Sequence, residues 1–200
     1  MTTLSRSPGA LLCRLLLAVI GWKAVCTVDP PRKAVIIAVP HTSNWDGFLM
    51  LVAAKALGLR IRWAFKADAA KGVVGWLLGK VGALPIRREG NQGVVEALVA
   101  EFGKHDDLLY AIAPSGTRKK TENWRSGFYH LARATGVPVL FGTVDYAGKR
   151  SGLIGIRELT GDVAADMDAI RAGYAGTAPK FPAKLTPMRL RDETPTADAD

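Results

Sequence analysis

Two side chains suited to acid–base chemistry, His41 and Asp46, lie at the junction of two apolar runs, with four residues between them. Imidazole is the side chain most often used as a general base near neutral pH, and a carboxylate on its other nitrogen fixes the tautomer and raises the basicity. A loop of this length lets the aspartate turn back to meet the ring. The alternative is structural, because Asp is favoured at helix caps and His41 would then simply end a strand. The spacing alone leaves both interpretations open.

A second polar group, Ser115-Gly116-Thr117-Arg118, follows an apolar run that breaks at Pro114. The backbone N–H groups of such a turn, with a guanidinium beside them, can bind a phosphate. A polar turn with a solvated basic flank is the alternative. A serine nucleophile is disfavoured here, because the turn lacks the Gly-x-Ser-x-Gly elbow of the hydrolases.

The net charge of the chain is +9, and the excess is concentrated in two stretches. Between residues 60 and 89 there are seven basic side chains against two acidic ones, and between 118 and 133 there are five against one. Lys66, Arg87 and Arg88 lie in the first stretch at the expected ends of strands. They could converge on one anion, although each alone is typical of a solvated surface.

This charge indicates an anionic partner, which is a nucleic acid, a lipid surface or a phosphorylated substrate. We expect no nucleic acid, because the basic residues flank apolar segments and no known binding motif occurs. The cysteine count is also informative. Only Cys13 and Cys26 occur, which excludes a disulfide framework and a cysteine-rich zinc site and fits a reducing compartment.

The first 28 residues contain an apolar stretch, residues 15–22, that is too short to cross a bilayer, which needs about 20 residues. Wound as a helix, the segment presents a broad apolar face and a narrow stripe formed by Arg14, Ala18 and Gly21. This pattern predicts an apolar, membrane-associating helix over residues 1–28 that lies in the interface. Packing on the domain and a secretory signal are the alternatives, although no small-x-small cleavage site precedes Asp29.

The elements that must position these residues alternate along the chain. Five runs have strand character, at residues 33–39, 61–65, 83–86, 108–113 and 137–144. Helical patterns separate them, at residues 47–57, 92–102 and 126–135. This order predicts a single α/β domain over residues 29–177, with a largely parallel sheet flanked by helices. We expect a further edge strand at 151–158 and a last helix at 162–172. Proline and charge predict a flexible tail over residues 178–200.

Four blocks follow one another in the order of the motifs of a known family. Residues 40–46 form a His-x4-Asp motif, and residues 65–88 form a block that ends in arginine. Residues 114–118 and the Val-Pro-hydrophobic residues 137–139 form the third and fourth blocks. Together they resemble the glycerolipid acyltransferase superfamily, which includes the lysophosphatidic acid acyltransferases. The departure is Ser115, where the family usually carries Glu, and this leaves the identity of the acceptor open.

The resemblance implies direct acyl transfer. His41, held by Asp46, would take the proton from an acceptor hydroxyl, which then attacks the thioester of acyl-CoA or acyl-carrier protein. No covalent acyl-enzyme is needed, since neither cysteine lies in the four blocks. The resemblance implies no metal and no cofactor, because the acyl carrier is a co-substrate.

The resemblance also assigns binding residues. The phosphate of a lysophospholipid acceptor, such as lysophosphatidic acid, would be held by Lys66, Arg118 and either Arg87 or Arg88. Three further residues would shape the loop around it, Ser115, Gly116 and Thr117. The implied location is the cytoplasmic face of a membrane with anionic lipid, with peripheral or monotopic attachment. A non-catalytic or altered-substrate relative that binds lipid or phosphate is the alternative, because of the serine.

Overall fold

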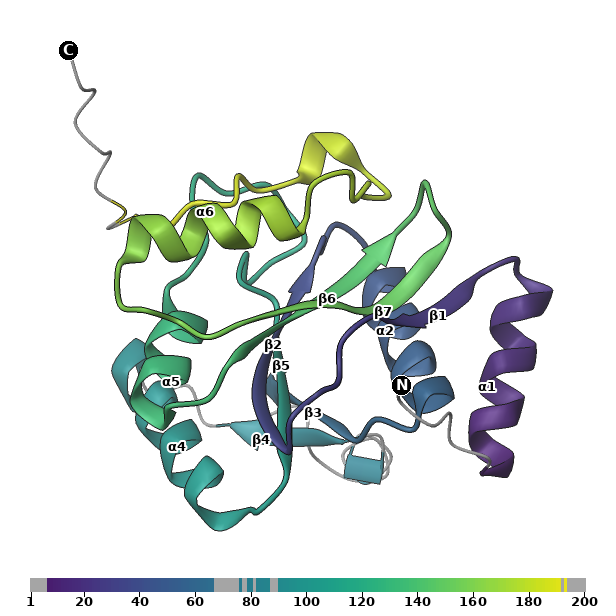
Figure 1. Cartoon of the computed structure of the whole chain (residues 1–200), viewed down its shortest axis with the longest axis horizontal. Coiled ribbons are helices and arrows are strands. Elements are labelled where there is room, and N and C mark those ends of the chain that lie inside the picture. Colours follow the sequence, from purple (N-terminus) through teal and green to yellow (C-terminus); the bar gives the residue numbers. More distant parts are fainter. Residues whose placement is uncertain are drawn as a thin grey trace.

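The computed structural model describes residues 7–66, 76, 79–80, 82–86, 90–191 and 193. In this part of the chain, seven strands form one sheet with the order β1-β7-β6-β2-β5-β3-β4 (Figure 1). Their bounds are β1 Lys23–Cys26, β2 Lys33–Val39, β3 Ile61–Lys66, β4 Ala83–Ile86, β5 Leu108–Ile112, β6 Val139–Asp145 and β7 Arg150–Arg157. Neighbouring strands pair in parallel except β6 and β7, which are antiparallel. The predicted α/β domain with a largely parallel sheet is therefore confirmed.

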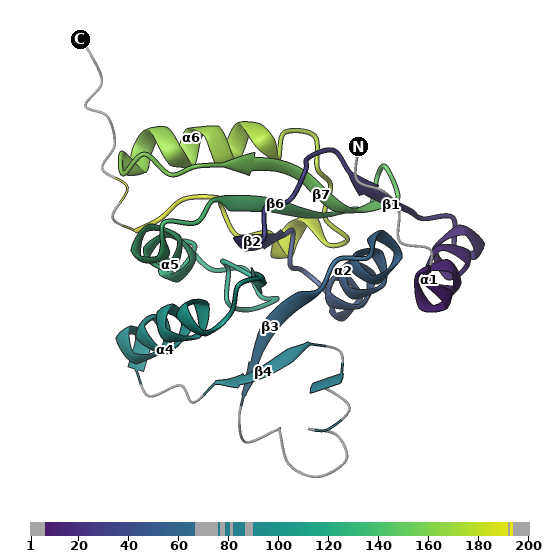
Figure 2. The same cartoon turned by 60° about the horizontal axis from the view of Figure 1, so that its bottom comes forward.

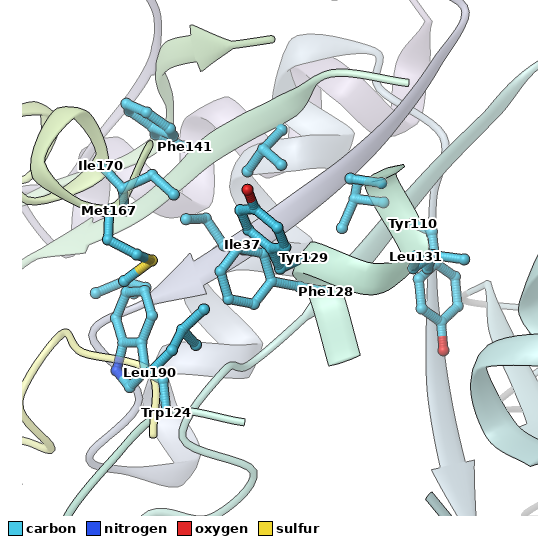
Figure 3. Close-up of a cluster of buried hydrophobic side chains, with 14 of the residues drawn as sticks. Ile37, Tyr110, Trp124, Phe128, Tyr129, Leu131, Phe141, Met167, Ile170 and Leu190 are labelled. Atoms are coloured by element: carbon cyan, nitrogen blue, oxygen red, sulfur yellow. The ribbon is translucent and has the colours of Figure 1, made fainter. Parts of the chain in front are cut away.

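Helices cover both faces of the sheet (Figure 2). Their bounds are α1 Pro8–Val19, α2 Asn44–Leu57, α4 Gly90–Lys104, α5 Gly127–Thr135 and α6 Val163–Gly173. Alternate residues of β2 point to opposite faces, as the pleat requires. Ile37 joins the larger core, which includes Phe128 of α5 and Met167 of α6 (Figure 3), whereas Ile36 packs beside Met50 of α2. The central strand β2 is thus fixed from both sides, and its carboxyl end is held in a rigid setting.

The predicted N-terminal helix is present, but it is shorter than the expected segment over residues 1–28. The helix α1 ends at Val19, and Gly21 then adopts a left-handed conformation with φ +73° that a helix cannot continue through. The chain turns into β1, an edge strand that pairs in parallel with β7. The strand at 151–158, expected at the edge, is therefore one place further in. No helix among the described residues is long and apolar enough to span a bilayer.

Residues 174–191 lie across the edge of the sheet where β2 and β6 end, and they include a short 3-10 helix, η2 Pro182–Lys184. The backbone N–H of Ala178 donates to Asp145 Oδ1 over 3.1 Å. Leu190 is buried and forms a parallel bridge with Trp124. The proline-rich and charged composition favours a flexible tail from residue 178. In the structure, packing contacts continue from that point to Leu190.

Candidate functional site

The two polar groups singled out in the sequence emerge from adjacent strands at the same edge of the sheet. β2 leads to His41, and β5 leads to the loop that contains Ser115. Because β2 and β5 are parallel neighbours, with Val35 opposite Tyr110, their carboxyl ends lie side by side (Figure 1). Ligands of open α/β sheets bind at this edge. The topology therefore brings together two groups that are more than seventy residues apart in the chain.

Asp46 lies in the first turn of α2, and the residue is 2% exposed. Oδ2 accepts hydrogen bonds from the backbone N–H groups of Thr42 at 2.6 Å and Ser43 at 2.8 Å. Oδ1 accepts from the hydroxyl groups of Ser43 at 2.6 Å and Tyr146 at 2.7 Å. An ionised carboxylate offers about four acceptor positions, so these four donors fill it. One oxygen thus caps the helix, as the structural interpretation expects, while the other faces two hydroxyl groups.

His41 is half-buried beside this carboxylate. No hydrogen bond links the His41 ring to Asp46 within the described part of the chain, so the interaction between them is electrostatic. Burial lowers the pKa of His41, the charge of Asp46 acts to raise that pKa, and the Arg118 guanidinium acts to lower it. The net lowering favours the neutral imidazole near pH 7, which is the form that can accept a proton.

The loop after β5 approaches His41 through Arg118, whose guanidinium contacts the Asn44 side-chain oxygen at the start of α2. Ser115 is buried, and its hydroxyl donates to the Thr117 backbone oxygen over 2.8 Å. The hydroxyl is therefore bound within its own loop, at the position where the resemblance leads one to expect a carboxylate. Gly116 has φ +65°, which a glycine adopts without strain.

Two residues at this edge were not predicted as site residues, and Arg125 stands in the sequence only as one of the basic side chains between residues 118 and 133. Arg125 lies so close to Gly116 that a Cβ atom there would be 2.7 Å from the arginine Nε. A side chain at position 116 would therefore meet Arg125. The sequence alone does not show that these two residues are in contact. Tyr146 follows β6, one hundred residues beyond Asp46, and its ring packs edge-on against Trp22 with centroids 5.0 Å apart. No motif or spacing indicated it.

Of the three basic residues predicted from the first charged stretch, the structure describes the backbone position of Lys66 only. Lys66 is the last residue of β3, and it pairs with Ile86 at the end of β4. Because β3 is also parallel to β5, this strand end lies at the same edge of the sheet as His41. Arg87 and Arg88 lie outside the described residues.

A small recess borders His41 at this edge. It is lined by Pro114 and Ser115 from the loop after β5 and by Leu185 and Thr186 from the C-terminal segment. Among the described residues, no group of three or more His, Cys, Asp or Glu side chains is placed to hold a metal ion. The described side chains at this edge that could take part in chemistry include the His41 imidazole, the buried Asp46 carboxylate and the Arg118 guanidinium.

Comparison with known proteins gives one match. A family model described as Acyltransferase matches residues 27–141, which is more than half of the chain. No curated protein and no solved structure matches the chain. The matched region contains His41, Asp46 and the loop at 115–118. Tyr146 and the C-terminal segment, which also contact this edge, lie outside it.

Proposed function

Because the chain belongs to the acyltransferase family, that of the glycerolipid acyltransferases, we propose that it transfers a fatty acyl group from acyl-CoA or acyl-carrier protein to a hydroxyl of a lysophospholipid acceptor such as lysophosphatidic acid. The observation that carries this proposal is the environment of His41. The imidazole is half-buried with a lowered pKa, in the fields of Asp46 and Arg118, at the edge of the sheet that the family model covers.

His41 acts as the general base in the proposed reaction. The neutral ring takes the proton of the acceptor hydroxyl while the acceptor oxygen forms a bond to the thioester carbonyl carbon. The carbon–sulfur bond then breaks, and the imidazolium returns the proton to the departing thiolate. The buried charge of Asp46 stabilises the imidazolium between these two steps. General-base assistance of this kind accelerates a reaction by about 10²–10⁴-fold.

Arg118 is the main candidate for holding the acceptor phosphate, because its guanidinium lies near His41 and can bind phosphate oxygens in pairs. Lys66 and either Arg87 or Arg88 complete the proposed anion site, and Gly116 and Thr117 shape the loop. Both proposed acyl donors also carry phosphate, acyl-CoA in its nucleotide part and acyl-carrier protein in its phosphopantetheine arm.

The proposed location is the cytoplasmic face of a membrane, with peripheral or monotopic attachment through α1. The side chains of Leu12, Leu15 and Val19 on this helix are exposed, whereas Leu17 packs into a cluster with Leu49 of α2. Exposed leucines of this kind are typical of a helix that lies in the lipid interface. Of residues 1–28, α1 is the proposed membrane-associating part, whereas β1 belongs to the sheet of the domain.

A second candidate is a relative that binds a lipid or phosphate without transferring an acyl group, or that uses another acceptor. Ser115 favours it, because its hydroxyl is bound to Thr117 and places no negative charge beside Arg118. The first candidate differs from both forms of the second in one observable, which is the release of the thiol from the acyl donor when lysophosphatidic acid is added.

The test is an assay of thiol release from acyl-CoA and from acyl-carrier protein, with lysophosphatidic acid and with non-phosphorylated acceptors. We expect His41→Ala to abolish release while the melting temperature stays within a few degrees of the wild type. His130→Ala on α5 is the matched control, because this histidine is exposed. Wild-type turnover by the purified His41→Ala variant would show that the proposed mechanism is wrong.

A further inference from the structure

Three exposed aromatic side chains gather beside the candidate site. Trp45 and Phe48, in the first turns of α2, are 55% and 42% exposed, and their rings meet edge-on with centroids 5.6 Å apart. Phe181, just before η2, is 40% exposed. Single exposed apolar side chains need no explanation, but a group of them marks an interaction surface.

Two lysines join these rings into one surface. The Lys180 ammonium lies 5.5 Å from the Trp45 ring centroid and 5.6 Å from that of Phe181. The Lys184 ammonium lies 4.6 Å from the Phe181 ring centroid. Within the described residues, neither lysine has a carboxylate within 4.0 Å, so both charges are available to a partner. We call Trp45, Phe48, Lys180, Phe181 and Lys184 the aromatic patch.

The aromatic patch borders the candidate site directly. Trp45 stands in the chain between Asn44, which contacts Arg118, and the buried Asp46. The backbone N–H of Phe181 donates to the Thr42 hydroxyl over 3.4 Å, next to His41. A partner that covers the patch therefore reaches the mouth of the site.

We propose that the aromatic patch docks on the headgroup layer of an anionic lipid bilayer and that the lipid acceptor passes from this layer to His41. This inference rests on the proposed function, and it names the surface through which the acceptor arrives. Trp side chains are enriched at the level of lipid headgroups, and basic residues near the surface are attracted to anionic lipid. The patch combines both features with no acidic residue.

The acyl-carrier protein is the other macromolecule that could meet this surface, if its own surface is acidic. Two lysines would suffice to recognise acidic side chains, whereas three exposed rings of this size fit a layer into which they can insert. A bilayer also accounts for the position of the patch beside the acceptor site. The helix α1, with its exposed leucines, packs on α2, which carries Trp45 and Phe48, so the two apolar surfaces belong to one pair of helices.

The test uses the full chain and two double variants. The first, Trp45→Ala with Phe181→Ala, removes two rings, and the second, Lys180→Gln with Lys184→Gln, removes both charges. Ile156→Ala on β7 is the matched control, because Ile156 is 44% exposed and belongs to another surface. Sedimentation with phosphatidylcholine vesicles, with and without phosphatidylglycerol, measures binding. Acyl transfer is measured with the acceptor in vesicles and with a short-chain acceptor that stays monomeric.

We expect the ring variant to bind both kinds of vesicle at least tenfold more weakly and to slow by a similar factor on the vesicle acceptor. Its rate on the monomeric acceptor should stay within twofold of the wild type. The charge variant should lose binding only to vesicles with phosphatidylglycerol. A loss of about 1 kcal/mol for each lysine corresponds to roughly 30-fold for the pair, and high salt should bring the wild type to the same level.

Three outcomes would overturn the inference. Unchanged vesicle binding by the ring variant would show that the patch does not dock on lipid. An equal loss of rate on the monomeric acceptor would place the rings in the acceptor site. A loss confined to acyl-carrier protein as donor would identify that protein as the partner. Vesicle binding needs no turnover, so this measurement stands even if His41→Ala contradicts the proposed reaction.

Discussion

Two buried aspartates, Asp46 and Asp166, occupy the first turns of α2 and α6, and each accepts a hydrogen bond from a tyrosine hydroxyl. Their side chains are 2% and 0% exposed. Asp166 also accepts from the Arg157 guanidinium, with Nη2 to Oδ1 at 3.1 Å. Asp46 is bonded only by neutral donors among the described residues, and His41 lies in its field. Similar carboxylates are thus held in two different ways.

The difference shows what each carboxylate can do. Burial alone would raise the pKa of Asp166, but the backbone N–H groups of Thr160 and Gly161, the Tyr129 hydroxyl and Arg157 hold it below the ordinary value. Its charge is neutralised locally, and it ties β7 to α6. Among the described residues no cation is bonded to Asp46, so its charge acts on His41 and opposes the lowering of the imidazole pKa. The charge of a buried carboxylate that is held by neutral donors is not neutralised locally, so it can act on a neighbouring titratable group.

The largest expected effect is that of Asp46→Asn on the rate. The new amide can face the hydroxyl groups of Ser43 and Tyr146, which can turn to accept, while its oxygen still accepts the backbone N–H groups. The fold should therefore survive, and the imidazolium of His41 loses its stabilising charge. We expect kcat/KM to fall about 10²-fold or more, with little change in melting temperature. A rate within threefold of the wild type would leave Asp46 as a helix cap only.

Asp166→Asn should give the reverse result. Both carboxylate oxygens accept backbone N–H groups, from Thr160 at 3.1 and 2.9 Å and from Gly161 at 3.2 Å. Either orientation of the amide then opposes a backbone donor, and Arg157 loses its partner. Because Arg157 is 33% exposed, we expect about 2–3 kcal/mol of destabilisation, below the range for a fully buried pair.

This loss corresponds to a melting temperature about 4–12 °C lower for a chain of this size, measured by thermal unfolding. The turnover of the folded fraction, assayed well below the transition, should match the wild type. A slower turnover with an unchanged melting temperature would contradict the distinction between the two aspartates.

The sequence predicts the part of this edge that lies within residues 27–141, but not the contacts made by later residues. His41 and Ser115 each follow a run of strand character, and a parallel sheet brings such ends together, so their proximity was predictable. No hydrogen bond joins His41 to Asp46 in the described part of the chain, because four other donors fill the carboxylate. Tyr146 could not be predicted, because its contact depends on the turn between β6 and β7. The strand β1 was missed because its residues continue the apolar pattern of α1.

Arg118→Gln should shift the pH dependence of the reaction. The Arg118 charge lowers the pKa of His41, so its removal should raise that pKa. At a given pH, a larger fraction of the His41 imidazole is then protonated. The base is active when neutral, so the acid limb of kcat/KM should move to higher pH. In Asp46→Asn, the acid limb of the residual activity should move to lower pH, because the Asp46 charge that acts to raise the His41 pKa is lost. All pH profiles are measured with the same acceptor, so that the ionisation of its phosphate affects every variant equally. If the acid limbs of the two variants and the wild type coincide, Arg118 and Asp46 do not set the pKa of His41.

The smallest expected effects come from the two tyrosines that donate to the aspartates. Burial, aided by the hydrogen bond to the carboxylate, raises the pKa of both Tyr129 and Tyr146 to about 12, so each hydroxyl stays protonated at neutral pH. One hydrogen bond contributes about 1 kcal/mol, so Tyr129→Phe and Tyr146→Phe should each lower the melting temperature by about 2–4 °C.

Only Tyr146→Phe should also slow the reaction, because it releases one of the four donors that orient Asp46. The same 1 kcal/mol, if it is lost in the transition state, corresponds to about fivefold in kcat, with KM for the acyl donor unchanged. Tyr129→Phe removes the same atom from a carboxylate that Arg157 and two backbone N–H groups still hold, so its kcat should equal that of the wild type. Equal slowing in both variants would mean that loosening of the fold, rather than the orientation of Asp46, sets the rate.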